Sequence, residues 1–402
     1  MNSATPPMQS KTGAKPDVQA RLTVTSQTLD ETSFTRFSTE FQTWQTLFEQ
    51  DPHARITQHP ELLLTELRHL AKSQSRRMVF IQCCSDSETL ALAILIPKSV
   101  GGNRKFWPAW RLNGYRLLGN RFLGNPTEHD QNQILAEVTN VLKCSRADFL
   151  LIEDIENSDP LLSLLAGNPH GLRLFRPAVE QRRWKIELPG SLEDYYKKFS
   201  SRSRNSLRRK VKRFGECRLE RIDRPDQVAV FLEESSKISL NSWQHDLLGE
   251  RISTDEIHQE FFTTLAIEGG LRAYQLWKVD RAVSFVIATQ YNGVLVFEET
   301  AYDRQFTKES PGQVLLIKML EDLFAHNPPR VFDFGGGDAE YKRMFGNVES
   351  VSGNIWILRP GLRSRLIVSC LSGRRTFNRC LRSILAKTGL LEWIRRKSRR
   401  GI

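Results

Sequence analysis

The order of apolar and polar positions divides the chain into two halves of mixed helix and strand character. In the first half, helices are predicted where apolar residues recur at helical spacing: 44–48, 60–70 and 131–142. Strands are predicted where β-favouring residues run together: 77–84, 89–97, 113–124 and 149–152. The first two of these strands flank a polar turn, which is the pattern of a hairpin.

The second half repeats this pattern more clearly. Predicted helices cover 192–214, 226–240, 254–267, 313–324 and 339–345. Predicted strands cover 184–188, 271–279, 282–289, 294–301, 330–334 and 354–358, of which the second to fourth read as an antiparallel meander. Both halves run from helices through a hairpin to a helix and a strand. The sequence therefore predicts an α+β fold of two similar modules, one of which we interpret as a degenerate copy of the other.

Composition sets the domain boundaries. Residues 1–30 are polar and without periodicity, which predicts a disordered leader before an N-terminal module at 31–180 and a C-terminal module at 181–358. A basic amphipathic tail at 359–402 follows. The polar N-terminus lacks the apolar segment of a signal peptide, and no apolar run is long enough for a membrane span, so a cytoplasmic location is expected.

The positive charge of the protein is concentrated at its end. The formal net charge is +12, and the tail alone holds 13 Lys and Arg against one acid, so the preceding 358 residues are neutral. The high isoelectric point is therefore no nucleic-acid signature for the whole chain. The six Cys and eight His show no zinc spacing, and neither a GxSxG elbow nor a phosphate-binding GxxxxGK[ST] loop occurs. These absences argue against metallohydrolases, serine hydrolases and P-loop enzymes, and no metal is expected.

Two stretches carry specific chemistry. In VFDFGGGDAEYKRMFG (331–346), a strand with Asp333 runs into three glycines and then a short helix with Tyr341 and Lys342. Consecutive glycines let a backbone approach a ligand closely, although a flexible connection is the alternative. In ESPGQVLL (309–316), Ser310 and Pro311 suit a helix start, and Gly312 leaves its first turn open to an anion.

Together these stretches resemble the C-terminal half of the CelD/BcsL-type acyltransferases, members of the GNAT superfamily related to the FemAB peptidyltransferases. The segments YYKKFSSRSRNSLRRKVKRF (195–214), NSWQ (241–244) and WQTLFEQDPHARITQHPELL (44–63) fit the same pattern. The resemblance covers roughly residues 40–358 and excludes the tail. It implies tandem GNAT-like modules, each a mostly antiparallel sheet flanked by helices, with the catalytic machinery in the second.

The resemblance also implies the donor and its site. The donor would be acetyl-CoA or another acyl-CoA, with its pyrophosphate at the helix start formed by Pro311, Gly312, Gln313 and Val314. The usual glycine-rich phosphate signature is represented by Gly312 alone. Tyr341-Lys342 and Phe345-Gly346 match the element that supplies an active-site Lys in FemAB relatives.

Acyl transfer needs a proton acceptor and a group that helps the thiolate leave. Glu298 and Glu299 are candidate bases, and because neighbouring strand residues face opposite ways, at most one is expected in the cleft, with Glu299 preferred. Asp333 is either catalytic or a cap of the glycine loop. Tyr341 is the candidate general acid, and Lys342 either stabilises an oxyanion, binds phosphate or is solvated.

Candidate acceptor ligands come from two regions. Trp243 and His245 would line an acceptor pocket, and the nine basic residues of 197–213 include Arg204 and Arg208, candidate ligands for phosphates or an acidic substrate. A solvated helix face is the alternative for these charges. The acceptor would be a small molecule or glycan, and nucleic acid is a partner only if aminoacyl-tRNA is the donor.

Three functions remain open from the sequence. The leading hypothesis is an acyl-CoA-dependent N- or O-acyltransferase acting on a sugar, polysaccharide or envelope precursor. The alternatives are FemAB-like aminoacyl transfer and a non-catalytic module that binds a polysaccharide-synthesis complex. In the tail, Leu381, Ile384 and Leu385 form an apolar stripe among basic residues, which predicts contact with an anionic membrane at the inner face; docking on the body and a disordered extension are alternatives.

Overall fold

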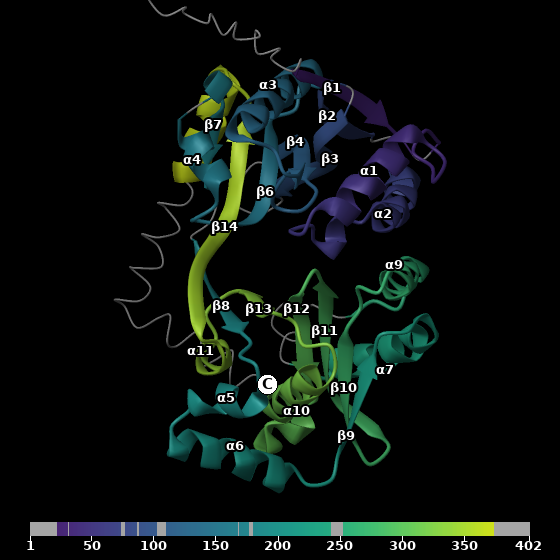
Figure 1. The fold of residues 1–402 in the computed structure, drawn as a ribbon, viewed down its shortest axis with the longest axis vertical. Helices are drawn as coiled ribbons and strands as arrows, with labels where there is room; N and C mark the ends of the chain where they lie inside the picture. The colour runs from purple at the N-terminus through teal and green to yellow at the C-terminus, as the bar shows by residue number, and fades with distance from the viewer. Residues whose placement is uncertain are drawn as a thin grey trace, which may run out of the picture.

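The computed structural model describes residues 22–30, 32–73, 77–86, 88–102, 110–167, 169–176, 180–242 and 252–373. Its two halves lie one above the other in Figure 1, and each contains strands flanked by helices. The mixed α/β fold with a mostly antiparallel sheet, predicted from the sequence, is confirmed.

Apart from two short strands and the 3₁₀ turns, the N-terminal module follows the order strand, two helices, three strands, helix, strand, helix. Its elements are β1 (Leu22–Leu29), α1 (Thr39–Gln50), η1 (Ile56–Gln58), α2 (Pro60–Ser73), β2 (Met78–Ser85), β3 (Glu88–Gly102), β4 (Trp110–Leu117), β5 (Leu123–Gly124), α3 (Glu128–Cys144), β6 (Phe149–Glu156), α4 (Pro160–Ala166), η2 (Pro169–Gly171) and β7 (Arg173–Phe175). One apolar cluster lies under α1 and α2, and a second lies under α3 and α4 on the opposite face of the sheet.

The C-terminal module repeats that order from its second strand onward. Its elements are β8 (Gln181–Glu187), α5 (Leu192–Lys197), α6 (Ser201–Phe214), β9 (Arg218–Ile222), η3 (Pro225–Gln227), α7 (Val228–Leu240), α9 (Glu256–Ile267), β10 (Ala273–Lys278), β11 (Arg281–Tyr291), β12 (Val294–Tyr302), η4 (Arg304–Glu309), α10 (Pro311–Ala325), β13 (Val331–Gly336), α11 (Glu340–Phe345) and β14 (Val348–Leu358). The core under α5, α6 and α10 is separate from the cluster that α7 and α9 share with α1 and α2.

One continuous sheet joins the modules, in the order β1-β2-β3-β4-β6-β14-β8-β13-β12-β11-β10-β9. The first half of β14 pairs with β8, and its second half pairs with β6, so the strand runs through both modules (Figure 1). The predicted boundary is therefore only partly right, because the last strand of the 181–358 segment completes the N-terminal sheet. Residues 354–358 alone gave no sign of a partner in the other module.

Three further expectations need correction. Residues 22–29 are not part of a disordered leader but form β1, which pairs along its length with β2; the strand is mostly exposed, so its apolar pattern is weak. The single helix expected at 192–214 is two helices, because Ser200 caps the start of α6 and accepts a hydrogen bond from the Ser203 N–H. The start of the tail, 362–373, is a helix whose Ile367, Val368 and Leu371 pack beside Trp356. Residues 1–21 and 374–402 lie outside the described chain.

Candidate active site

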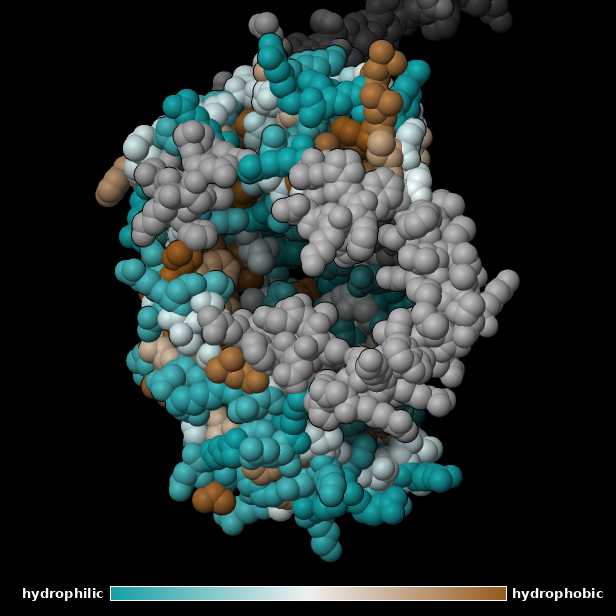
Figure 2. Space-filling view, turned by 180° about the vertical axis from the view of Figure 1, so that it is seen from behind, coloured by the Kyte–Doolittle hydropathy of each residue, from teal (hydrophilic) through white to brown (hydrophobic). Residues whose placement is uncertain are grey.

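A groove lies between the two modules, over the face of the C-terminal sheet opposite α10. It consists of two cavities of about 660 and 590 Å³ that share Arg55, Thr57 and Asn120 of the N-terminal module, and we call it the intermodule groove. Figure 2 shows the surface hollowed between the two halves of the molecule. These cavities are in the size range of small-molecule sites.

A β-bulge in β12 places two carboxylates in this groove. Ala288 pairs with Phe297 and Ile287 with Glu299, so Glu298 is the extra residue of the bulge. Glu298 lines one cavity of the groove and Glu299 lines the other, while Phe297 packs in the core beneath α10. The expectation that at most one of the two glutamates faces the cleft is therefore wrong. A bulge breaks the alternation of side chains, and the sequence does not reveal it.

The bulge coincides with the point where β12 and β13 separate. These parallel strands pair only from Val294–Val331 to Val296–Asp333, and from Phe297 onward β12 keeps β11 as its partner while β13 keeps β8. Separated parallel strands leave backbone groups on their facing edges without a ladder partner. Glu298 therefore stands on the groove side at the mouth of this gap.

A buried ion pair fixes the floor of the groove. The Arg183 side chain is 1% exposed, and its Nε lies 2.8 and 2.7 Å from the two carboxylate oxygens of Asp333. Its guanidinium also pairs with Asp154 of β6, which in turn accepts a hydrogen bond from Ser352. Burial alone would lower the pKa of Arg183, but the carboxylates of Asp333 and Asp154 outweigh it and raise the pKa.

Asp333 thus has contacts that belong to the framework. Besides the ion pair, its Oδ1 accepts the N–H of Gly335 at 2.9 Å, which is the cap of the glycine loop considered as an alternative from the sequence. Gly335 and Gly337 have φ of 68° and 99°, and a Cβ on Gly336 would lie 2.7 Å from Gln181 Oε1. Backbone conformation therefore explains Gly335 and Gly337 without a ligand, whereas the flexible Gln181 side chain beside Gly336 could move aside for a larger residue.

Glu298 is the carboxylate with the properties of a base. The walls of the groove partly desolvate this carboxylate and raise its pKa, and Asp154 and Asp333 act in the same direction, against Arg55 and Arg183. Its side chain nevertheless reaches solvent, and it forms no ion pair or hydrogen bond within the described part of the chain. Burial likewise lowers the pKa of Arg55, which faces the same cavity. Sequence reasoning named Glu298 but preferred Glu299, and it missed Arg55, Asp154 and Arg183, for which no motif gives a signal.

Tyr341 and Lys342 lie on α11, beside the separated strands and on the core side of the sheet. The Tyr341 ring packs against Phe297 and Phe334, and burial raises its pKa to about 12. The Nζ of Lys342 donates hydrogen bonds to the carbonyls of Phe334 and Gly336 at 2.7 and 2.8 Å. Lys342 thereby supplies hydrogen-bond donors to carbonyls at the end of β13, where β12 no longer pairs with it. Burial lowers the pKa of Lys342.

The start of α10 is open but offers few donors. Ser310 adopts a left-handed conformation with φ of 59° and makes no side-chain cap, and Pro311 has no N–H. Both Gln313 and Val314 donate their N–H to the Ser310 carbonyl, which leaves the Gly312 N–H as the donor of this turn without an acceptor among the described residues. Lys210 of α6 contacts the Gln313 side chain, so a cation stands beside the turn.

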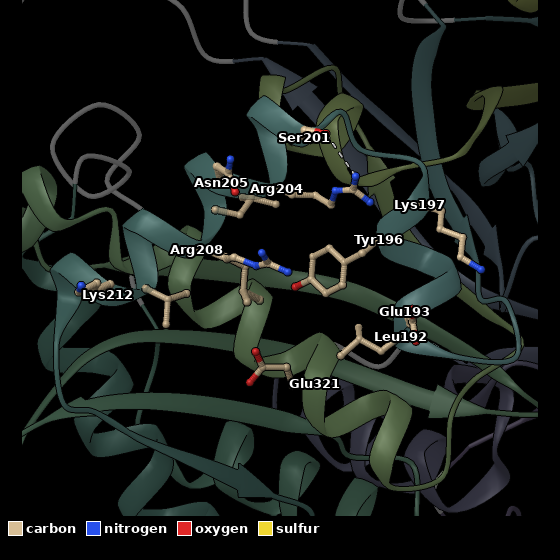
Figure 3. A pocket seen from close by; sticks show the side chains of 13 residues that line it. Leu192, Glu193, Tyr196, Lys197, Ser201, Arg204, Asn205, Arg208, Lys212 and Glu321 are labelled. Atoms are coloured by element: carbon tan, nitrogen blue, oxygen red, sulfur yellow. Dashed lines mark hydrogen bonds between the residues drawn. The ribbon is translucent and has the colours of Figure 1, made fainter.

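The remaining candidates fall elsewhere. Arg204 and Arg208 line a separate pocket between α5, α6 and α10, shown in Figure 3. Trp243 and His245 lie outside the described residues. Among the residues that the structure describes, no cluster of three or more His, Cys, Asp or Glu is arranged to hold a metal ion.

Comparison with known proteins agrees with this geometry. Residues 201–343 match the family model described as the acetyltransferase (GNAT) domain. This part of the chain is therefore similar in sequence to GNAT domains. No curated protein matches the chain significantly.

Solved structures extend the likeness to both modules. A structure of FemX superimposes with a TM-score of 0.58 at 12% identity, over 82% of this chain and 98% of that one. The C-terminal DUF2156 domain of a protein from Agrobacterium fabrum, named as a lysylphosphatidylglycerol synthetase, gives a TM-score of 0.53 at 13% identity, over 83% and 96%. At these identities the likeness concerns the fold, and the GNAT-like order of elements occurs twice in this chain.

Proposed function

We propose that this protein is an acyltransferase that moves an acyl group from acyl-CoA, with acetyl-CoA as the simplest donor, to an amine or hydroxyl held in the intermodule groove. The observation that carries the proposal is Glu298, a carboxylate of raised pKa at the mouth of the gap between β12 and β13. The acceptor would be a sugar, polysaccharide or envelope precursor, as for CelD/BcsL-type enzymes.

In this proposal the donor and the acceptor bind on opposite faces of the C-terminal sheet. The thioester lies in the gap, with the donor on the side of α10 and α11 and the acceptor on the side of the groove. The acceptor atom attacks the thioester carbon, and its proton passes to Glu298 as the new bond forms and the C–S bond breaks. Tyr341, whose pKa burial raises to about 12, is protonated at neutral pH and gives its proton to the leaving thiolate. Lys342 holds the end of β13 in place.

Aminoacyl transfer from aminoacyl-tRNA is the second candidate. It is favoured by the few backbone donors at the start of α10 and by the basic surface of α6, which suits a donor with many phosphates. The third candidate is a non-catalytic module that binds a polysaccharide-synthesis complex. Thermal-shift measurements with acetyl-CoA, CoA and tRNA distinguish the three, because a ligand that binds only the folded protein raises its melting temperature.

The decisive experiment is Glu298→Gln, which keeps the shape of the side chain and removes its basicity. We expect turnover to fall by about 10²-fold or more, the usual scale for loss of a general base. Because a base works when deprotonated, the acid limb of the wild-type kcat/KM profile should lie above the ordinary Glu value of 4.5, and this limb should disappear in the variant.

Stability provides the control. A raised pKa means that the folded state holds this proton more tightly than the unfolded state, so the ionised carboxylate costs stability as pH rises above 4.5. Glu298→Gln should therefore melt no lower than the wild type at neutral pH. The exposed Glu233→Gln on α7 serves as the matched variant and should retain full activity. Normal turnover with an unchanged pH profile in Glu298→Gln would exclude Glu298 as the base.

A further inference from the structure

The nine basic residues of 197–213, seven of them on α6, are largely without anionic partners. Lys197 pairs with Asp194 at 2.6 Å, and Lys198 donates to the carbonyls of Phe345 and Gly346. The other seven have no carboxylate within 4.0 Å among the residues described here: Arg202, Arg204, Arg208, Arg209, Lys210, Lys212 and Arg213. Seven positive charges on one helix repel one another, and this repulsion destabilises the helix. A bound anion would relieve it.

Part of this helix lines a pocket of about 890 Å³ on the outer side of the C-terminal module, the α6 pocket. Its apolar lining is Leu192, Leu207, Val211 and Ile317, and its cations are Lys197, Arg204, Arg208 and Lys212. Figure 3 shows the Arg208 guanidinium beside the Tyr196 ring, and Arg204 above them. The pocket therefore combines an aromatic ring, apolar walls and guanidinium groups in one place.

The two acids of the pocket do not neutralise these guanidinium groups. Glu321 pairs with Lys318 at 2.8 Å, and Glu193 is exposed at the edge. Among the described residues, the side chain of Arg204 reaches the hydroxyl of Ser201 alone, at 3.4 Å. Planar guanidinium groups bind phosphate through paired hydrogen bonds, and an aromatic ring with apolar neighbours accepts the face of a nucleobase.

The α6 pocket adjoins the proposed phosphate position at the start of α10. Lys210 contacts Gln313 in the first turn of α10, while Arg208 lies two residues and Arg204 six residues earlier along α6. A rise of 1.5 Å per residue puts Arg204 about 9 Å along the axis from Lys210. A ligand whose pyrophosphate meets Gly312 can therefore extend along α6 into the pocket.

We propose that the α6 pocket binds a nucleoside phosphate, and that this is the 3′-phosphoadenosine end of the acyl-CoA donor, with Arg208 on the 3′-phosphate and Tyr196 beside the adenine. The inference rests on the proposed function, because it takes acyl-CoA as the donor. A nucleotide-linked sugar acceptor is the other source of the same chemistry, and the test separates the two.

The experiment is calorimetry on the full chain with CoA, dephospho-CoA, adenosine 3′,5′-bisphosphate and UDP-N-acetylglucosamine. Dephospho-CoA differs from CoA only in lacking the 3′-phosphate. Arg208→Gln should weaken CoA binding about tenfold or more, the scale of one charge-assisted contact, and should change dephospho-CoA binding far less. Arg209→Gln is the matched control, since Arg209 is the next residue, carries the same charge, is exposed and does not line the pocket.

Each outcome decides the matter. Equal losses for CoA and dephospho-CoA, or equal effects of Arg208→Gln and Arg209→Gln, would overturn the assignment while leaving the donor intact. Binding of UDP-N-acetylglucosamine that depends on Arg208, with CoA unaffected, would assign the pocket to the acceptor instead. If CoA does not bind the wild-type protein, acyl-CoA is not the donor. If adenosine 3′,5′-bisphosphate does not bind either, the α6 pocket is not a nucleotide site.

Discussion

Each module contains a pair of parallel strands that separate partway along their length, but different residues follow the point of separation. In the N-terminal module, β4 and β6 pair from Gly114–Phe149 to Arg116–Leu151 and then separate, as β12 and β13 do in the C-terminal module. Beyond the last pair, β4 continues with the buried Leu117 and Leu118. The corresponding positions of β12 are Phe297 and Glu298. One gap thus ends in apolar packing and the other in a carboxylate that faces a groove.

The helices that follow β4 and β12 differ in whether their first turn can accept an anion. Thr127 caps α3 and forms a capping box with Asp130, and Glu128 adds a second acid to the first turn. Donors bonded to side chains and two negative charges exclude a phosphate there. The first turn of α10 has neither a side-chain cap nor an acid, and Lys210 lies beside it. An anion is therefore accommodated only in the C-terminal copy of this pair.

The N-terminal module still contributes to the site. Arg55 forms one wall of the intermodule groove, and Asp154 holds Arg183 from the opposite side of the Asp333 pair. Asn120 bridges to the Asp154 carbonyl at 3.2 Å across the N-terminal gap. The gap between β12 and β13 is thus open to the groove, whereas the module that contains the β4–β6 gap forms a wall of the groove. This difference predicts which variants affect chemistry.

Tyr341→Phe should produce the largest change among tests of this comparison. It removes one hydroxyl beside the C-terminal gap, and we expect turnover to fall by about 10²-fold with little change in donor affinity, as for a lost general acid. Steady-state kinetics with separate kcat and KM values check this. Tyr115→Phe on β4 is the matched change in the N-terminal module and should be silent; equal activity of both variants would make Tyr341 a packing residue.

Gly312→Asp tests the difference between the helix starts. It gives α10 the acidic first turn that α3 already has, and we expect acyl-CoA binding to weaken about tenfold or more by calorimetry. The nearest atom to a Cβ at Gly312 is Tyr302 Cδ1 at 3.6 Å, so the fold should tolerate the side chain. Gly312→Ala controls for size and should bind nearly normally. Unchanged affinity in Gly312→Asp would place the donor elsewhere.

The sequence predicts the elements better than the site, for a physical reason. Periodicity depends on neighbours along the chain, so the meander of β10 to β12 and the helix α10 are correctly predicted. The bulge at Glu298, the Arg183–Asp333 pair and the partner change within β14 depend on residues over 100 positions apart or on a one-residue slip between strands. The GNAT-like stretches around Gly312 and Tyr341 pointed to the right module, but only the fold shows that Glu298 faces the groove.

The tail gives the smallest expected effect. Its first helix packs on the N-terminal module through Ile367, Val368 and Leu371, and Arg363 pairs with Asp148 at 2.7 Å. Ten of the 13 basic residues of the tail follow in 374–402. No described helix is long and apolar enough to cross a membrane. From the concentration of basic residues in 374–402, we propose that this segment contacts an anionic surface by charge, at about 1 kcal/mol per basic residue near the leaflet.

Deletion of 374–402 separates this contact from catalysis, because it leaves the docked helix and every residue of the intermodule groove in place. The full chain should co-sediment with vesicles containing phosphatidylglycerol, and binding should fall as salt rises, since exposed charges are screened within about 10 Å at 0.1 M. The deleted chain should stay in the supernatant and keep full turnover on a soluble acceptor. Co-sedimentation that survives the deletion, or that is absent for the full chain at low salt, would show that the tail does not bind the membrane surface.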